Sequence, residues 1–363
     1  MLPINTLTVL IICFVYFYRT TLDALIPLLR KDAHTVISFP TRELTGGRVT
    51  FLLLYHIARS LLRRIGFGPN LSVSSSVNQD AETEHRLKGV DISLSMPFRI
   101  TSLDLKQYST CISPSGIQNK YQDILQDNGH CQLILSALTE PSMLLLLSKI
   151  NCPIDPIGSV NVRNRLEIVQ PALLLQSLNK QLEEKYVKLR TTAKLDESVK
   201  KVKRGWEFKI IVELLSDIEG TALYRQEFTM LQFHKHSSPP ESIKPDEVPT
   251  EAIGSFKMGA AEPGDWAKVS RDYNPIHTSN IAAKLLGFNR KIAHGNHVVA
   301  KAIDILSQPC SDQRSWMEVE FRRPVAVPSK LDVRAAEMDE NGTTRRWEVW
   351  TKGKVATLIS CGI

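Results

Sequence analysis

The residues best suited to chemistry lie close together in the last third of the chain. Asp272 and His277 stand on either side of the dipeptide Asn274-Pro275. Proline fixes its own φ and moves the preceding residue away from helical geometry, so the dipeptide predicts a turn that directs both side chains to one side. A carboxylate and an imidazole placed together can take and deliver protons. The spacing therefore predicts a general acid and base pair.

A glycine downstream of this pair marks the predicted start of a helix. Gly295 follows His294 and precedes a run of apolar residues with helical spacing: Val298, Val299, Ala302, Ile303, Ile305 and Leu306. This pattern gives one broad apolar face and predicts a buried helix. Backbone N–H groups at a helix start, together with the helix dipole, can hold a carbonyl oxygen that gains negative charge. Gly295 is therefore a candidate third part of the site.

The elements that must position these residues follow from periodicity and turn residues. The pattern predicts a short helix over 280–286, which Gly287 ends, and an irregular crossing over 288–293. Strands are expected near 317–321, 331–338, 345–351 and 354–359, and earlier in the chain at 160–169, 207–215 and 222–233. Both halves are therefore expected to be α+β with antiparallel sheet.

Polar stretches suggest how the chain is divided. Residues 72–88 are rich in Ser, Asn, Asp and Glu, and residues 237–250 hold four prolines, so both stretches are predicted linkers. The predicted division is a hydrophobic segment at 1–31, an amphipathic helix and linker at 32–88, a first domain at 89–236, a Pro-rich linker at 237–250, and a last domain at 251–363.

The run DYNPIH from Asp272 to His277, with the downstream IAHG, resembles the MaoC-like dehydratases and (R)-specific enoyl-CoA hydratases. Their usual form is SGDxNPxH followed by a helix and xxHG. The later run Phe321, Arg322, Arg323 and Pro324, followed by Pro328, is similar to the closing FxRP-xxxP segment of that family. Residues 157–164 and 203–205 look like the amino-terminal half of double hot-dog members. The resemblance implies two hot-dog units, each an antiparallel sheet around a central helix, with the motif kept only in the second.

The resemblance also implies a reaction and roles for the site residues. It implies a hydro-lyase of fatty-acid metabolism that hydrates trans-2-enoyl thioesters or dehydrates (R)-3-hydroxyacyl thioesters carried on CoA or an acyl-carrier protein. Asp272 and His277 would be the catalytic pair, Asn274 would orient them, and the Gly295 amide would polarise the thioester carbonyl. No metal or redox cofactor is expected. Two alternatives are a catalytically inactive, membrane-bound acyl-thioester scaffold and a hot-dog thioesterase.

Two further residues carry open questions. Arg271 stands where the family usually has glycine, and a positive φ there would cost arginine about a kcal/mol or shift Asp272. Its guanidinium is either solvated or binds an anionic part of the substrate. His297, on the first turn of the predicted helix, is either a structural histidine or a second acid or base.

The amino terminus predicts attachment to a membrane. Residues 2–18 are almost wholly apolar, close to spanning length, and no small-residue cleavage site follows. Basic residues follow the segment on its carboxyl side: Arg19, Arg30 and Lys31. They favour a single-pass anchor whose catalytic body lies in the cytosol. The membrane could be that of an organelle. A buried helix or an import segment is the alternative. Residues 48–64 predict either a basic helix lying on a membrane or a helix packed on the first domain.

Composition excludes some classes of function. The net charge of +7 favours anionic partners, but no nucleic-acid motif or basic patch with interleaved aromatics accompanies it, so no nucleic-acid partner is expected. The six cysteines are scattered, which predicts reduced thiols and no zinc site. His234 and His236 fit strand alternation better than metal ligation. A homodimer is a possible assembly.

Overall fold

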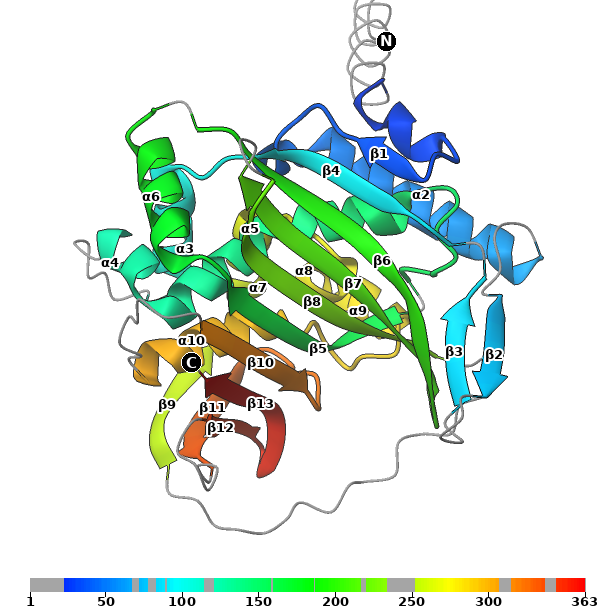
Figure 1. Ribbon diagram of the computed structural model, residues 1–363. Helices are drawn as coiled ribbons and strands as arrows, with labels where there is room; N and C mark the ends of the chain where they lie inside the picture. The colour runs from blue at the N-terminus through cyan, green and yellow to red at the C-terminus, as the bar shows by residue number, and fades with distance from the viewer. Residues whose placement is uncertain are drawn as a thin grey trace, which may run out of the picture.

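The computed structural model describes residues 23–66, 72–77, 83–88, 90–113, 121–157, 159–185, 187–216, 220–233, 252–306, 315–336 and 344–362. One large sheet runs through this part of the chain, with strand order β1-β4-β6-β7-β8-β5-β10-β13-β12-β11-β9 (Figure 1). The small hairpin β2 and β3 joins it at β6. Neighbouring strands are antiparallel except β1 and β4, which are parallel.

The first half of the sheet curves around a long apolar helix. Its strands are β4 (Ser93–Phe98), β5 (Ser159–Ile168), β6 (Leu189–Val202), β7 (Gly205–Ser216) and β8 (Ala222–Phe233), and the helix is α5 (Asn128–Ser148). Buried and exposed residues alternate along the start of β6, as expected for a strand with one face on the core. Gly205 begins β7 where a Cβ would lie 1.9 Å from the carbonyl oxygen of Gln232, so only glycine fits there.

The second half repeats this arrangement around a shorter helix. Its strands are β9 (Ala252–Met258), β10 (Ser315–Phe321), β11 (Ser329–Ala335), β12 (Thr344–Thr351) and β13 (Lys354–Gly362). The helices are α7 (Glu262–Ser270), α8 (Pro275–Thr278), α9 (Asn280–Leu285) and α10 (Gly295–Leu306). Helix α10 is the central one and is buried over most of its length. The predicted helix start at Gly295 is confirmed.

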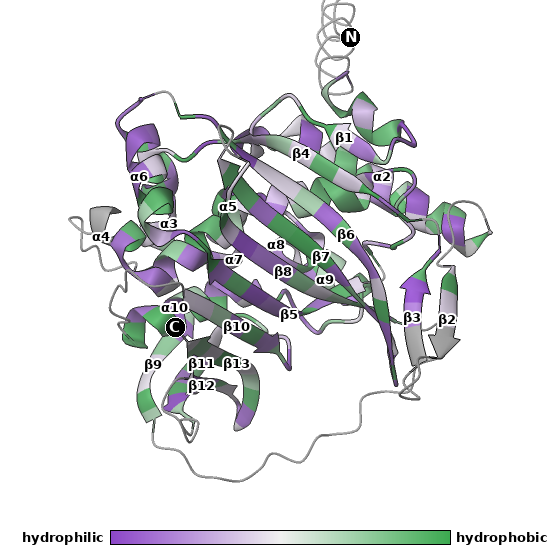
Figure 2. Ribbon diagram, viewed as in Figure 1, coloured by the Kyte–Doolittle hydropathy of each residue, from purple (hydrophilic) through white to green (hydrophobic). Residues whose placement is uncertain are grey.

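The remaining elements cover the edges. They are η1 (Ile26–Leu29), β1 (His34–Val36), η2 (Thr41–Glu43), α2 (Gly47–Arg64), β2 (Val73–Val77), β3 (Thr83–Leu87), α3 (Ser102–Ile112), α4 (Tyr121–Gln126) and α6 (Pro171–Leu182). Figure 2 shows hydrophobic residues along α5 and, on the strands, interspersed with hydrophilic ones. One apolar core joins α5 to α10, and a second lies among η1, α2 and the first strands.

Strand pairing and a buried polar network join the two halves. Strand β5 pairs with β10 in antiparallel register, so both halves share one sheet. Behind it, Asn164 Nδ2 donates to Asn296 Oδ1 at 2.9 Å, and Asn296 Nδ2 donates to Ser136 Oγ at 2.9 Å. Gln226 Nε2 donates to the same hydroxyl at 2.9 Å. Because buried polar groups need partners, this network fixes how α10 sits against α5.

The expected α+β class, with antiparallel sheet around a central helix in each half, is confirmed. The hydrophobic anchor segment 2–18, the Pro-rich linker 237–250 and the His234 and His236 pair lie outside the described residues. Of the other predicted linker, 72–88, residues 72–77 and 83–88 are described, and they form the hairpin of β2 and β3 that pairs with β6. The residue limits of the predicted domains stay predictions. Within the described part, α5 is the one helix long and apolar enough to cross a membrane, and 89% of its apolar window is buried inside the protein. We therefore treat α5 as the core helix of the first half.

Helix α2 does not arrange its residues as a basic membrane-surface helix would. Two of its arginines face inward: Arg59 donates to the carbonyl oxygens of Leu147 and Cys152, and Arg63 also donates to the latter. Apolar side chains of the same helix are exposed instead, among them Leu54 and Leu61. The helix thus packs on the first half of the protein through Arg59 and Arg63, and it exposes apolar side chains on its opposite surface.

Candidate active site

Asp272 follows helix α7 at a sharp change in chain direction. Arg271 ends the helix in the left-handed conformation, with φ 61°, and its N–H donates to the carbonyl oxygen of Ala267 at 2.9 Å. The backbone N–H of Asp272 then donates to Ser270 Oγ at 3.2 Å. Arg271 therefore has the positive φ that would make glycine the easier residue here, in a conformation that costs a residue with a Cβ about 1–2 kcal/mol.

The predicted turn at Asn274-Pro275 is also present. The Asn274 side chain accepts a hydrogen bond from the Ile276 N–H at 3.2 Å and so caps α8, with Pro275 at the start of the helix. The Asn274 backbone N–H donates to Asp272 Oδ1 at 3.0 Å. Asn274 thus contacts the aspartate through its main chain and holds the helix of His277 through its side chain.

His277 lies on α8 with its ring buried and directed at Asp272. Its Nε2 is 3.8 Å from Asp272 Oδ2, while its Nδ1 donates to the carbonyl oxygen of Ile292 at 2.9 Å. Burial lowers the pKa of His277, which the charge of Asp272 and the bond to Ile292 offset only in part. The imidazole is therefore neutral at pH 7, and with the proton on Nδ1 its Nε2 carries a free lone pair.

The crossing before α10 is tied down on both sides. The Ile292 N–H donates to the Ile276 carbonyl oxygen at 3.1 Å, on the α8 side. On the other side, the Ala293 N–H donates to Val325 O at 2.8 Å. The predicted closing segment FRRP thus leads directly into the backbone that supports the crossing. This explains how residues far apart in sequence fix the orientation of His277.

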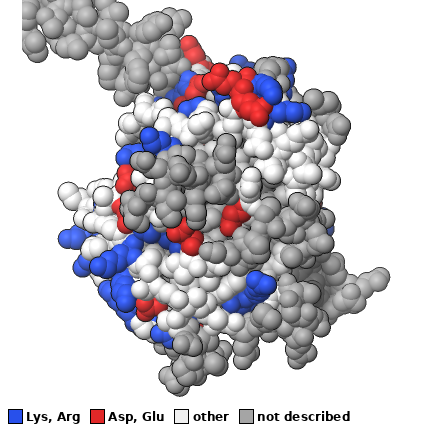
Figure 3. Space-filling view, turned by 90° about the vertical axis from the view of Figure 1, so that its left-hand side faces the viewer, with Lys and Arg blue, Asp and Glu red and all other residues white. Residues whose placement is uncertain are grey.

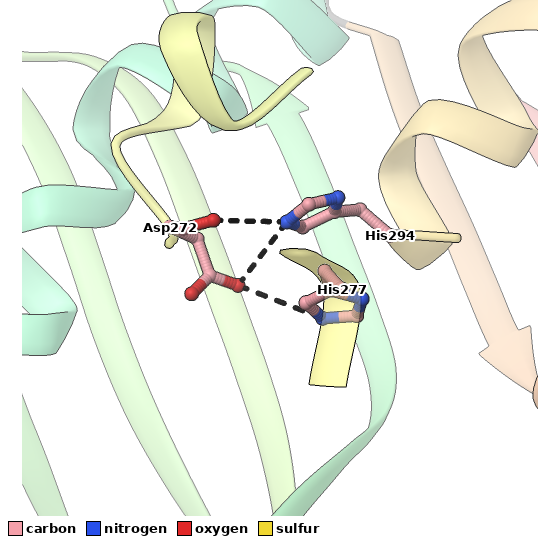
Figure 4. A group of neighbouring side chains, drawn as sticks. All are labelled: Asp272, His277 and His294. Carbon is pink, nitrogen blue, oxygen red and sulfur yellow. Dashed lines mark hydrogen bonds and ion pairs between the residues drawn. The ribbon is translucent and has the colours of Figure 1, made fainter. Parts of the chain in front are cut away.

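A second histidine, His294, completes the cluster. Its Nε2 donates to the backbone carbonyl oxygen of Asp272 at 3.0 Å and lies 3.7 Å from Asp272 Oδ2 (Figure 4). Its ring stacks on that of His277, with centroids 3.8 Å apart and an angle of 26°. Burial holds the pKa of His294 well below the ordinary value, and positive charge on His277 would lower it further. His294 received no role from the sequence, although the IAHG run signalled it.

Gly295 follows His294 and begins α10, where the first N–H groups of a helix have no partner within it. A Cβ here would lie 2.4 Å from Cε1 of Phe321, so the packing of that ring requires glycine. Chain connectivity thus places the Gly295 amide next to the cluster of Asp272, His277 and His294. Its action on a carbonyl stays a prediction.

Glu140 on α5 is a residue that the sequence did not reveal. Burial raises the pKa of its carboxyl well above the ordinary value, and the negative charge of Asp272 raises it further. Glu140 thus belongs to the electrostatic surroundings of Asp272 although it comes from the other half of the chain. No local motif marks it, because only the packing of the two halves brings it near.

His297 faces away from this chemistry. Its ring stacks on Trp266 at a centroid distance of 4.9 Å, and its Nε2 donates to the Cys111 carbonyl oxygen at 3.1 Å. Burial lowers its pKa to about 4. These contacts support the structural interpretation of His297.

The three clustered side chains are of types that can ligate a metal ion. In the described part of the chain, ligand atoms of Asp272, His277 and His294 all lie within 4.8 Å of one another. However, a metal ligand must offer a lone pair, and His294 Nε2 uses its proton to bind the Asp272 carbonyl oxygen. A metal would have to break that bond. The hydrogen bonding therefore favours acid–base chemistry.

Comparisons with known proteins find a matching family model and curated relatives. The family model described as MaoC like domain matches residues 243–358. A 3-hydroxyacyl-thioester dehydratase X from Mycobacterium tuberculosis is 27% identical over 210 residues, which cover 56% of this chain and 68% of that protein. An (R)-specific enoyl-CoA hydratase from Aeromonas caviae is 29% identical over 114 residues, which cover 30% of this chain and 85% of that protein.

Solved structures share the fold. The crystal structure of HtdX from Mycobacterium tuberculosis superposes with a TM-score of 0.54 and 18% identity, covering 75% of this chain and 100% of that one. A MaoC-like dehydratase from Phytophthora capsici superposes with a TM-score of 0.56 and 15% identity, covering 75% of this chain and 95% of that one. Both matches extend over the two halves of the sheet, well beyond the stretch that the family model covers.

Proposed function

We propose that the protein is a hydro-lyase, and the match of residues 243–358 to the MaoC like domain model supports this. It hydrates trans-2-enoyl thioesters and, in reverse, dehydrates (R)-3-hydroxyacyl thioesters. The observation that carries the proposal is the carboxylate of Asp272 facing the unprotonated Nε2 of a neutral His277 at 3.8 Å. Such a pair supplies the two proton transfers that the reaction needs.

The proposed chemistry balances without a redox step. His277 Nε2 takes a proton from water as its oxygen bonds to C3 of the enoyl thioester, and the C2=C3 π electrons move toward the thioester oxygen. The Asp272 carboxylate stabilises the imidazolium that forms. The protonated pair then returns one proton to C2, so that the net change is addition of one water. The Gly295 amide is proposed to hold the enolate-like oxygen, aided by the dipole of α10.

Kinetics of the full chain in detergent test the proposal. Wild type is expected to hydrate crotonyl-CoA or longer enoyl-CoA thioesters to the (R)-3-hydroxy product, followed by loss of enoyl absorbance and by chiral analysis. Asp272→Asn and His277→Gln should each reduce kcat/KM roughly 10²–10⁴-fold with folding intact. An (S)-product would overturn the family mechanism. Binding of acyl-CoA without turnover at any chain length would favour the scaffold, and release of free thiol would favour a thioesterase.

We propose further that no metal takes part. The hydrogen bond from His294 Nε2 to the Asp272 carbonyl oxygen supports this, since it occupies the nitrogen that a metal would need. Activity is expected to survive prolonged treatment with a chelator, and added zinc is expected not to raise it. Loss of activity on chelation with recovery on metal addition would contradict the proposal.

We propose that the protein is attached to a membrane by residues 2–18, with its catalytic body in the cytosol. Two features support this: the charges that follow the apolar segment, and the outward-facing apolar residues of α2, of which Leu54 is 57% and Leu61 55% exposed. Fractionated cells should hold the full chain in the membrane pellet after an alkaline wash. Recovery in the supernatant after that wash would contradict the anchor.

A further inference from the structure

A basic pocket opens beside the residue that precedes Asp272. It has a volume of about 530 Å³, within the usual range for small-molecule sites. Its lining comprises Pro40, Arg42, Glu43, Thr45, Arg48, Arg99 and Arg271. Four guanidinium groups thus share one concavity with one carboxylate. Like charges gathered in one pocket repel one another, and an anion bound among them would offset that repulsion.

Arg271 connects this pocket to the candidate active site. It is bonded directly to Asp272, and it holds the left-handed backbone that is unusual for arginine. Its Nε is buried without a hydrogen-bond partner in the described structure. A strained backbone and an unsatisfied buried donor both cost free energy, and both occur here at the same residue. A ligand that accepts hydrogen bonds from this guanidinium would offset that cost.

The other arginines differ in how they are held. Arg48 is fixed: it donates to the Glu43 carbonyl oxygen at 2.9 Å, lies 3.6 Å from the carboxylate of Glu43, and covers the ring of Phe39. Arg42 and Arg99 have no carboxylate within ion-pair distance among the residues that the structure describes. The pocket therefore holds more positive charge than its own carboxylate neutralises.

Positive charge on the surface is not by itself distinctive. On the face shown in Figure 3, basic side chains gather at the lower left, and both signs of charge occur together near the top. The pocket stands out because several guanidiniums from separate segments converge on one hollow: two from residues 42–48, one after β4 and one after α7. Arginine binds phosphate oxygens in pairs, so several arginines suit a ligand that carries several phosphates.

We propose that this pocket binds the phosphate groups of the coenzyme A part of the acyl thioester, an inference that rests on the proposed function. The extended pantetheine arm separates those phosphates from the thioester, so a phosphate pocket belongs at the entrance of the site and not at the reacting atoms. Arg271 lines this pocket and is bonded through its main chain to Asp272, so it connects the two places. Coenzyme A presents three phosphates on one small molecule, which suits a single concave pocket. A carrier protein presents one phosphodiester on a large surface. Two of the four arginines that line the pocket, Arg42 and Arg48, belong to residues 40–48, which precede both predicted hot-dog units.

The test compares two substrates that share the reacting group. Crotonyl-CoA carries the phosphates, whereas crotonyl-pantetheine carries none. For wild type we expect kcat/KM at least about tenfold higher with crotonyl-CoA. In Arg42→Gln/Arg99→Gln this preference should largely vanish through a higher KM for crotonyl-CoA, with kcat and the crotonyl-pantetheine kinetics unchanged. Arg345→Gln, an exposed arginine on β12, is the matched control and should keep the preference.

The possible failures are separable. Equal kcat/KM for both substrates in wild type, or a preference that survives in the double variant, overturns the pocket and leaves the hydro-lyase intact. A crotonyl carrier protein favoured over crotonyl-CoA also overturns it. If no thioester reacts, the proposed function fails, and calorimetry with adenosine 3′,5′-bisphosphate tests the pocket alone. Binding by wild type that the double variant loses supports the pocket, and no binding by wild type overturns it.

Discussion

Nδ1 of His277 donates a hydrogen bond of 2.9 Å to the backbone carbonyl oxygen of Ile292. This bond fixes which ring nitrogen holds the proton, and so which one faces Asp272. A side-chain acceptor in the same place could itself titrate, whereas a backbone carbonyl does not. The tautomer of His277 is therefore set by the main chain of the crossing that leads into α10.

The first prediction concerns pH. Hydration by a neutral His277 requires its unprotonated form, which dominates above its pKa, and burial lowers that pKa from the ordinary 6.5. The kcat/KM of wild type should therefore stay level as the pH falls through 6.5 and decline only at lower pH. A pH–rate profile measures this, with fluorescence at each pH as the control for folding. An acid limb centred above pH 6.5 would contradict it.

The second prediction concerns His294 as a positioning residue. His294→Leu removes the donor to the Asp272 carbonyl oxygen, so the aspartate loses a restraint and kcat should fall roughly ten- to hundredfold with little change in KM. His294→Gln keeps an N–H donor and should recover part of the loss. Steady-state kinetics of both variants measure this. Equal kcat for the Leu and Gln variants would argue against the hydrogen bond.

The third prediction concerns backbone strain at Arg271. Glycine adopts a φ of 61° without a Cβ penalty, so Arg271→Gly should raise the free energy of unfolding by about 1 kcal/mol. Arg271→Ala keeps the Cβ and should give no such gain. Denaturant titration of both variants separates strain from loss of the guanidinium. Equal stability of the two variants would show that the strain is not there.

The fourth prediction concerns the glycine at the start of α10. In Gly295→Ala the new Cβ meets the Phe321 ring, and the clash should lower the free energy of unfolding by about 1–3 kcal/mol. In a Phe321→Ala background the same substitution should cost much less, because the opposing ring is gone. A double-mutant cycle in denaturant measures this coupling. Additive effects would rule out the contact as the reason for glycine.

The fifth prediction concerns acid stability. His297 is neutral in the folded protein down to a pKa of about 4, whereas in the unfolded chain it binds a proton near the ordinary 6.5. The unfolded state therefore holds more protons between these values, and stability falls as the pH drops through this window. From pH 6.5 to 5 the loss due to this residue is about 2 kcal/mol. In His297→Gln the free energy of unfolding, measured by denaturant titration at both pH values, should change less between them than in wild type. An equal change in the variant would mean that other groups cause the pH dependence.

Local sequence rules predicted the acid–base pair well because they depend on neighbours in the chain. Proline geometry determined the turn after Asp272, the αL position fell where a glycine was expected, and the apolar spacing after Gly295 predicted the first turn of α10. The class of fold followed for the same reason, since strand alternation and helical periodicity are local signals.

Contacts between segments that are distant in the chain could not be predicted from the sequence. The contact of His294 with the Asp272 carbonyl oxygen, the influence of Asp272 on Glu140, and the convergence of Arg42, Arg99 and Arg271 all join residues far apart in the chain. The inward direction of Arg59 and Arg63 on α2 also depends on distant segments, since their acceptors are carbonyl groups after α5 or at its end.

The sequence by itself determined the residue types at the candidate site and the turn that aims them. Only the tertiary structure decided their protonation, because burial and the Ile292 carbonyl, not the motif, make His277 neutral with a free Nε2. It also decided that Arg271 lines a basic pocket instead of lying free in solvent. The physical reason is that desolvation and charge clustering depend on distances through space, which spacing along the chain does not contain.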